Sequence, residues 1–222
     1  MPIELTPVQK IAVWALPILF ALTLREIAHG WAAYALGDRT PMMFGRLSLN
    51  PLNHADPIGT VVIPLVMILL GGFVFGWARP VPVSMRNFKH PRRGMALVAA
   101  AGPLANFVMA FLWALLLRLA LAQEASEGMW LGVQAMSLAG VSFNLVIAII
   151  NLLPIPPLDG GRMVNGLLPS RLSMKYERLE PYGFFIVAIF LMTPMFNQLL
   201  YWPMALAQYF IFSLAGVSAH TL

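Results

Sequence analysis

The chain has 222 residues, of which 59% are hydrophobic and only 10% are charged, and its formal net charge is +5. Soluble domains contain roughly 25% charged residues, so this composition is that of a membrane protein. The chain contains no cysteine, which excludes a disulfide framework, a thiolate nucleophile and a thiolate metal ligand. The basic residues lie beside apolar segments, where they set membrane orientation, so the net charge does not indicate nucleic-acid binding.

The first long apolar run predicts a transmembrane helix over residues 9–36, because a crossing needs about 20 apolar residues. Residues 11–24 have the apolar character of a signal-peptide core, but no cleavage site of small residues follows them. We therefore expect this helix to be retained. After a turn rich in Gly, Asp and Pro, a short extended segment is predicted near 42–50, followed by a polar turn.

The second apolar stretch, residues 58–76, either crosses the membrane or enters it and returns on the same side. The re-entrant alternative is favoured because it places nearly all Lys and Arg residues on the cytosolic side. The next segment, residues 78–84, contains Pro80 and Pro82. Each proline removes a backbone donor and biases its neighbour to extended geometry, so an extended segment is predicted here.

Two further transmembrane helices are predicted over residues 94–120 and 130–153. The first is rich in small residues, which let membrane helices approach closely. Three prolines in four residues break the second helix just before Asp159. Broken backbone at membrane depth is tolerated only where it is buried in protein or lines a cavity, so a site is expected near Asp159.

The last apolar run, residues 181–219, is long enough for two crossings, with a break near Thr193 or Trp202. The predicted fold class is therefore an all-α polytopic membrane protein with five to six transmembrane or re-entrant helices. We expect a single membrane-embedded domain over residues 1–222, in which residues 9–170 form the core and residues 181–219 the C-terminal helices.

Three polar residues, Arg25, Glu26 and His29, lie inside the first predicted helix. Charge at membrane depth costs ~2.5–3.5 kcal/mol per residue and marks a functional site by default. Glu26 and His29 are three residues apart and share one helix face. This spacing is the second half of His-Glu-x-x-His, a helical zinc site. Its first position holds Arg25, which stays protonated and has no lone pair to offer a metal.

Several pieces of sequence, in the same order, resemble the site-2 protease family of intramembrane zinc metalloproteases. The resemblance covers residues 20 to about 170. The matching pieces are Glu26-Ile-Ala-His29-Gly-Trp, Gly45-Arg-Leu-Ser-Leu-Asn-Pro, His54-Ala-Asp-Pro-Ile-Gly-Thr, Phe75-Gly-Trp-Ala-Arg-Pro-Val-Pro-Val, Ala101-Gly-Pro-Leu-Ala-Asn106 and Asn151-Leu-Leu-Pro-Ile-Pro-Pro-Leu-Asp159-Gly-Gly.

The resemblance implies an enzyme that hydrolyses peptide bonds of transmembrane substrates through a zinc-activated water. Carried over to the matching positions, it implies one Zn²⁺ with His29 and Asp159 as ligands and Glu26 as the catalytic base. A bound water of this kind has a pKa near 7, low enough to attack an amide carbonyl. Asn151 would help to hold the substrate or the oxyanion. Asn106 either shares that role or forms interhelical hydrogen bonds.

Arg25 departs from the family motif, and three interpretations are open. In the first, His54 enters the coordination sphere with His29 and Asp159. In the second, no zinc binds and Arg25 pairs with Asp159 or Glu26, so that the protein is a pseudoprotease that binds membrane helices without cutting them. In the third, Arg25 is an inactivating change, or it points away while two ligands and water hold a weakly bound metal.

The expected partners are transmembrane protein substrates or bound membrane helices, within a lipid bilayer. The expected location is a bacterial inner (plasma) membrane. A small transporter that uses the same polar residues as a relay is a further alternative. Transporters often contain inverted or parallel repeats, and the two halves of this sequence show none.

Overall fold

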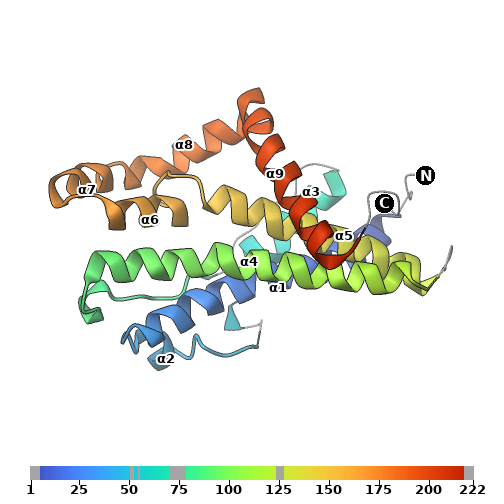
Figure 1. The fold of residues 1–222 in the computed structure, drawn as a ribbon, viewed down its shortest axis with the longest axis horizontal. Helices are drawn as coiled ribbons and strands as arrows, with labels where there is room; N and C mark the ends of the chain where they lie inside the picture. The colour runs from blue at the N-terminus through green and yellow to red at the C-terminus, as the bar shows by residue number, and fades with distance from the viewer. Residues whose placement is uncertain (1–5, 51–52, 55, 71–78, 124–127, 218–222) are drawn as a thin grey trace.

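The computed structural model describes residues 6–50, 53–54, 56–70, 79–123 and 128–217, and within these ranges the chain is helical and contains no strand. The all-α prediction is confirmed. Figure 1 shows α1, α4 and α5 as long neighbouring helices, with α6 to α9 on one side of them. The elements are α1 (Pro7–Ala35), α2 (Thr40–Met43), η2 (Pro57–Val62), α3 (Ile63–Leu70), η3 (Met85–Asn87), α4 (Pro91–Leu121), α5 (Met129–Asn151), α6 (Asp159–Leu167), α7 (Ser170–Glu177), α8 (Glu180–Met192) and α9 (Pro194–Ala215).

Three of the described helices are long and apolar enough to cross a membrane. They are α4, α5 and residues Val8–Ala35 of α1. They correspond to the transmembrane helices predicted over residues 9–36, 94–120 and 130–153, and the observed bounds differ from the predicted ones by a few residues. The C-terminal run contains α8 and α9, separated at Thr193, one of the two predicted break points. These two helices are not among the three long apolar ones.

The apolar stretch after residue 56 forms η2 and α3, of six and eight residues. Together they are about 20 Å long, whereas the hydrocarbon core of a bilayer is about 30 Å thick. The described helix is therefore too short to cross, which is compatible with the re-entrant alternative. The remaining part of the predicted stretch, residues 71–76, lies outside the described residues.

The two predicted extended segments differ in outcome. Residues 79–84 are non-helical and extended, although no strand pairs with them in the described part of the chain; residue 78 lies outside it. The segment predicted near 42–50 begins instead as the short helix α2 and continues as turns. Pro41 occupies the first turn of α2, where a missing N–H costs nothing, and Gly45 then reverses the chain with a φ of 66°.

The helices pack around α4, which contacts α1, α5, α6 and α9. Between apolar helices in lipid, van der Waals contact at close approach stabilises the packing. Gly140 of α5 allows such an approach, because a Cβ there would lie 2.4 Å from the Trp113 ring of α4. The main buried cluster joins three helices: Ala110, Trp113, Ala114 and Leu117 of α4, Val141 and Leu145 of α5, and Ile211 and Ala215 of α9.

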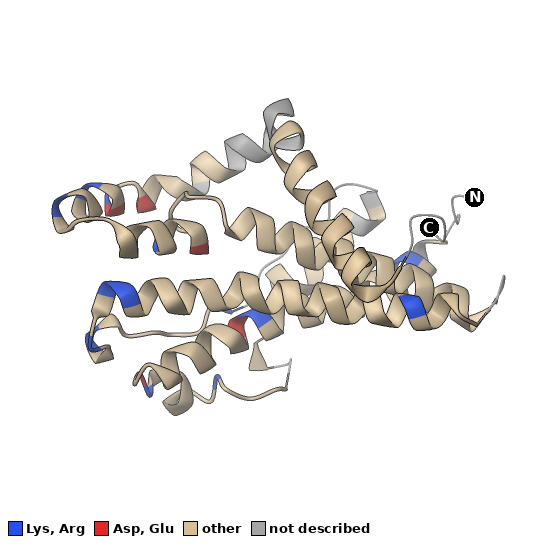
Figure 2. Cartoon of the chain, viewed as in Figure 1, with Lys and Arg blue, Asp and Glu red and all other residues tan. Residues whose placement is uncertain are grey.

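Lys and Arg residues gather at the end of the molecule where α7 and the start of α4 lie, as Figure 2 shows. Few basic residues lie at the opposite end. Membrane proteins carry such an excess on their cytosolic side, so the distribution predicts that the α7 end faces the cytosol.

Candidate functional site

The polar side chains predicted from the sequence converge where α1, α5 and α6 meet. Glu26 and His29 come from α1, Asn151 ends α5, and Asp159 begins α6. Glu26 is 7%, His29 8% and Asp159 3% exposed. Asp159 reaches this place because the proline-rich residues 152–158 interrupt the helical path between α5 and α6.

The Arg25 guanidinium lies at the centre of this cluster. Its Nη2 donates to Asp159 Oδ2 at 2.6 Å and to Asn151 Oδ1 at 2.9 Å. Its Nη1 donates to Glu26 Oε1 at 3.0 Å. One planar cation therefore joins both buried carboxylates, an arrangement for which the fork of arginine donors is suited. The Nε of Arg25 is buried and has no hydrogen-bond partner in the described part of the chain.

The His29 ring is held between α4 and Asp159. Its Nδ1 lies 2.8 Å from the Val98 carbonyl oxygen, and its Nε2 lies 3.4 Å from Asp159 Oδ2. If Nδ1 carries the proton, it donates to the Val98 carbonyl and leaves the Nε2 lone pair facing Asp159. The ring fits against α4 only because residue 102 is glycine, since a Cβ there would lie 2.3 Å from His29 Cε1.

Glu26 connects the cluster to the extended segment 79–84. Its Oε2 accepts a hydrogen bond from the Val81 backbone N–H at 3.0 Å, while Oε1 accepts from Arg25. Both carboxylate oxygens of the predicted base are thus engaged. Val81 also packs near Gly30 of α1, where a Cβ would lie 3.3 Å from Val81 Cγ1.

Asp38 holds the other end of this segment. Its Oδ2 accepts from the Ser84 backbone N–H at 2.7 Å, and its Oδ1 accepts from Asn87 Nδ2 at 2.6 Å. Burial raises the pKa of the Asp38 carboxyl, but hydrogen bonds, first among them that from Thr40, outweigh burial and lower the pKa below its ordinary value. Glu26 within α1 and Asp38, three residues after its end, therefore fix the path of residues 81–84.

Two predicted candidates lie elsewhere. His54 is fully buried, and its Nε2 lies 2.9 Å from the Ser48 carbonyl oxygen; no hydrogen bond or ion pair links it to His29 or Asp159 in the described part of the chain. Asn106 donates to the Ala21 carbonyl oxygen at 3.1 Å and to Asn144 Oδ1 at 2.9 Å. Asn106 therefore joins α1, α4 and α5 by interhelical hydrogen bonds, the second of its two predicted roles.

We asked whether these residues fit a zinc ion. A catalytic zinc takes three protein ligands and leaves one position open. Among the described residues, no group of three or more His, Cys, Asp or Glu side chains is arranged to hold a metal ion. Asp159 is already paired with a guanidinium that cannot be deprotonated. The donor set present does not fit a three-ligand zinc centre.

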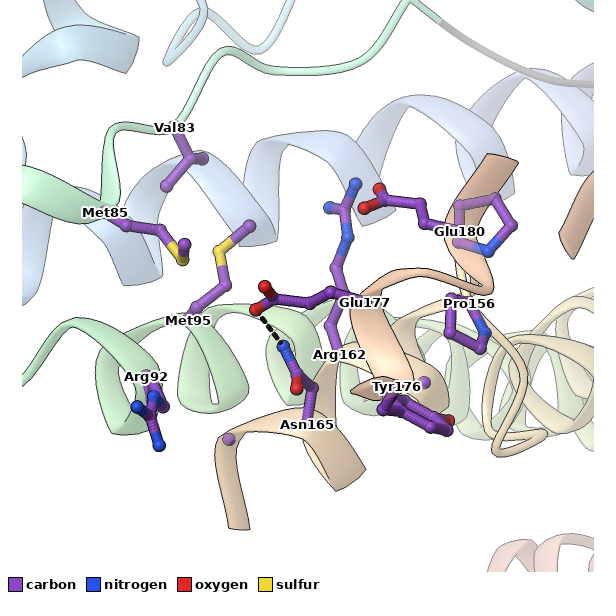
Figure 3. A pocket seen from close by; sticks show the side chains of 13 residues that line it. Val83, Met85, Arg92, Met95, Pro156, Arg162, Asn165, Tyr176, Glu177 and Glu180 are labelled. Atoms are coloured by element: carbon purple, nitrogen blue, oxygen red, sulfur yellow. Dashed lines mark hydrogen bonds between the residues drawn. The ribbon is translucent and has the colours of Figure 1, made fainter. Parts of the chain in front are cut away.

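A pocket of about 400 Å³ is lined by Pro156 and Pro157, which precede Asp159 in the chain, together with residues of α4, α6 and α7. Figure 3 shows Val83 of the extended segment and Met85 of η3 on one wall and Arg162, Glu177 and Glu180 on the other. Gly161, two residues after Asp159, also lines it. The pocket therefore connects the extended segment to the basic end of the molecule.

The sequence was compared with known proteins. A family model described as peptidase family M50 matches residues 118–194. The Bacillus subtilis protein named "Putative zinc metalloprotease YwhC" is 38% identical over 200 residues, which cover 89% of this chain and 88% of that protein. The chain belongs to peptidase family M50, the site-2 protease family.

A second M50 relative, "Putative zinc metalloprotease Rip2" of Mycolicibacterium smegmatis, is 34% identical over 222 residues, covering 96% of this chain and 79% of that protein. No solved structure matches the chain. The resemblance predicted from the sequence is confirmed at the level of family. Membership, together with the three long apolar helices, makes the chain a membrane protein whose relatives are named as zinc metalloproteases.

The sequence alone does not indicate four residues that shape this cluster. Val81 and Val98 act through backbone atoms, which no side-chain pattern can indicate. Gly102 is one of several small residues in the predicted helix 94–120, and nothing in its spacing shows that it faces His29. Asp38 belongs to the predicted turn after the first helix. Its role as a buried anchor depends on Ser84, which lies far along the chain.

Proposed function

We propose that this M50 protein captures a transmembrane segment of another membrane protein and holds part of it in extended form at the cluster around Glu26 and Asp159. The observation that carries the proposal is the position of the extended segment 79–84. It lies at the buried polar cluster, linked to it by the Val81 N–H to Glu26 hydrogen bond.

The backbone beside the cluster supports this proposal. Irregular backbone at membrane depth is tolerated only where it is buried in protein or lines a cavity. Pro80 and Pro82 have no N–H, and the Val83 N–H has no hydrogen-bond partner in the described part of the chain. An unwound partner segment presents the carbonyl groups that such a donor needs.

Arg25 provides a second unpaired donor. Its Nε is buried without a partner among the described residues, and a buried donor left unsatisfied costs about 1–3 kcal/mol. A carbonyl oxygen of a captured segment would satisfy it. The neighbouring pocket offers room for the continuation of that segment towards the basic end.

The test uses the full chain in phosphatidylglycerol-containing nanodiscs, with a photo-crosslinking amino acid at Val83. The probe is a synthetic transmembrane peptide with Gly-Pro at its centre, because these residues lower the cost of unwinding a helix. We expect crosslinking to this peptide and little to an uninterrupted Leu-Ala helix. The matched control carries the crosslinker at Leu104, which is exposed on α4. Equal crosslinking from both positions, or none from Val83, would contradict the proposal.

A second candidate function is hydrolysis of the captured segment by a zinc peptidase with Glu26 as base. It is favoured by the names of the relatives and by the His29 ring, whose Nε2 faces Asp159. It requires a donor set other than the one described, with either His54 or water completing it. The test is incubation of the same peptide with zinc-supplemented protein, with Glu26→Gln as the control; cleavage by the wild type alone supports it.

A further inference from the structure

Arg25 occupies the place at which the chain departs from the family motif, and it pairs there with two buried carboxylates. Its guanidinium is hydrogen-bonded to a carboxylate on α1 and to another on α6, at 3.0 and 2.6 Å. In the described residues no other Lys or Arg forms an ion pair within 4.0 Å. Among the described residues, Arg25 is therefore the one Lys or Arg that forms an ion pair, and it lies between Glu26 and Asp159.

We propose that the Arg25 guanidinium replaces the metal ion of this family: it cross-links Glu26 to Asp159 by itself, and the native chain binds no zinc at this site. The inference concerns the same cluster as the proposed capture of a transmembrane segment. Its functional consequence, capture without cleavage, rests on that proposed function.

Charge balance argues for replacement rather than coexistence. Two buried carboxylates need positive charge nearby, because an unpaired buried charge is strongly unfavourable. Arg25 supplies it permanently, since its side chain stays protonated at any relevant pH. A divalent ion beside it would be repelled at contact distance, and it would compete for Asp159 Oδ2, the atom that Arg25 Nη2 contacts at 2.6 Å.

The geometry of the available metal ligands also favours replacement of the metal ion by Arg25. The two donors suited to a metal, His29 Nε2 and Asp159 Oδ2, lie 3.4 Å apart. A third protein ligand is absent among the described residues. The missing ligand corresponds in sequence to position 25, four residues before His29, which is the spacing of two histidines on one helix face. Restoring histidine there would remove the guanidinium and add the ligand in one step.

The experiment is zinc content by elemental analysis of detergent-purified full-length protein from zinc-supplemented cultures. We expect little or no zinc in the wild type and about one zinc ion per chain in Arg25→His, the stoichiometry of a three-ligand site. Arg25→His combined with Asp159→Asn should return to the wild-type level. The matched control, Arg25→Lys, keeps the charge but loses the planar fork, and it should bind no zinc.

Melting temperature gives a second readout that does not depend on activity. A chelator should lower the melting temperature of Arg25→His, because metal bound to the native state contributes to its stability. The wild type should be unaffected. Near-stoichiometric zinc in the wild type that is lost on Asp159→Asn overturns the inference, as does a well-folded Arg25→His that binds none. If Arg25→His does not fold, the wild-type zinc content and its response to chelator still decide.

These outcomes separate the inference from the proposed function. A zinc-free wild type that fails to crosslink the peptide from Val83 leaves the replacement by Arg25 standing and removes segment capture. A zinc-loaded wild type that does crosslink removes the replacement and leaves capture standing.

Discussion

At the residue scale, we infer that Arg25 changes the chemistry of this site while leaving its framework in place. His29, Glu26 and Asp159 still converge, and their burial is that of a functional cluster. In the proposed replacement, a guanidinium joins them in place of a metal ion. A guanidinium offers donors in a plane, whereas a metal offers empty coordination positions, so the same carboxylates serve as hydrogen-bond acceptors here.

Gly102 is the residue on which the position of His29 depends. Gly102→Ala would place a Cβ 2.3 Å from His29 Cε1 and 3.1 Å from Arg25 Cγ, so the His29 ring must move away from Val98. We expect destabilisation of about 1–3 kcal/mol, the usual cost of overpacking, although alanine is intrinsically the better helix former. Chemical unfolding in detergent measures it.

The control for this variant is Gly132→Ala in α5, where a Cβ would meet no atom within 4 Å. That substitution should be neutral or stabilise by up to about 1 kcal/mol, through helix propensity alone. If the two substitutions change the free energy of unfolding equally, the close approach of α4 to His29 does not limit the residue at position 102.

At the scale of elements, the extended segment 79–84 depends on separate hydrogen bonds rather than on sheet pairing. The Arg79 N–H donates to the His54 carbonyl oxygen at 2.9 Å. Glu26 holds it at Val81, and Asp38 holds it at Ser84. An isolated extended chain lacks the interstrand hydrogen bonds of a β-sheet, so these hydrogen bonds to side-chain carboxylates take their place. Asp38 lies outside the membrane-spanning helices, so the effect of its charge on stability can be tested by changing the pH.

Asp38→Asn is expected to lower stability at pH 7 by about 1.5–3 kcal/mol, the value of hydrogen bonds to a charged group, because its amide nitrogen would face either the Ser84 N–H or the donors of Thr40 and Asn87. The folded-state pKa of Asp38 lies below its ordinary value of 3.8. Its contribution is therefore complete above that value and is lost as the pH falls through the folded-state pKa.

Thermal unfolding of the wild type and Asp38→Asn at pH 7 and at pH 3 tests this prediction. The difference between the two proteins should shrink at the lower pH. Glu180→Gln, which removes an exposed carboxylate from α8, serves as the control and should show no such convergence. A constant difference across pH would contradict the assigned role of the Asp38 charge.

At the scale of the whole molecule, charge distribution predicts orientation. Basic residues gather at the α7 end (Figure 2), so this end should face the cytosol. The chain lacks cysteine, and single-cysteine variants therefore report topology without background. Leu172 of α7 is 52% exposed, and Gln123 follows α4 at the opposite end and is exposed.

A membrane-impermeant maleimide applied to intact cells should label Gln123→Cys and not Leu172→Cys. Opening the cells should make Leu172→Cys reactive, while labelling of Gln123→Cys stays the same. The reversed pattern would show that the basic end lies outside the cytosol. Equal labelling of both before opening would place both ends on one side and contradict an odd number of crossings between them.

The amino-acid sequence by itself determined the membrane class, the helices α1, α4 and α5, and the family. Apolar runs of sufficient length form helices in lipid whatever their neighbours, because every backbone group must be satisfied internally. It also determined that Glu26, His29, Asn151 and Asp159 belong together, through the family motifs. It failed at 42–50, where Pro41 and Gly45 set a helix and a turn locally.

Only the tertiary structure decided what Arg25 does, because its partners Asn151 and Asp159 lie far along the chain. The same holds for Asn106, which proved to join helices, and for His54, which contacts Ser48 instead of the cluster. The partners that a side chain contacts across a helix interface depend on which helices meet there. Spacing along one helix fixes the face on which a residue lies, and packing fixes what that face touches.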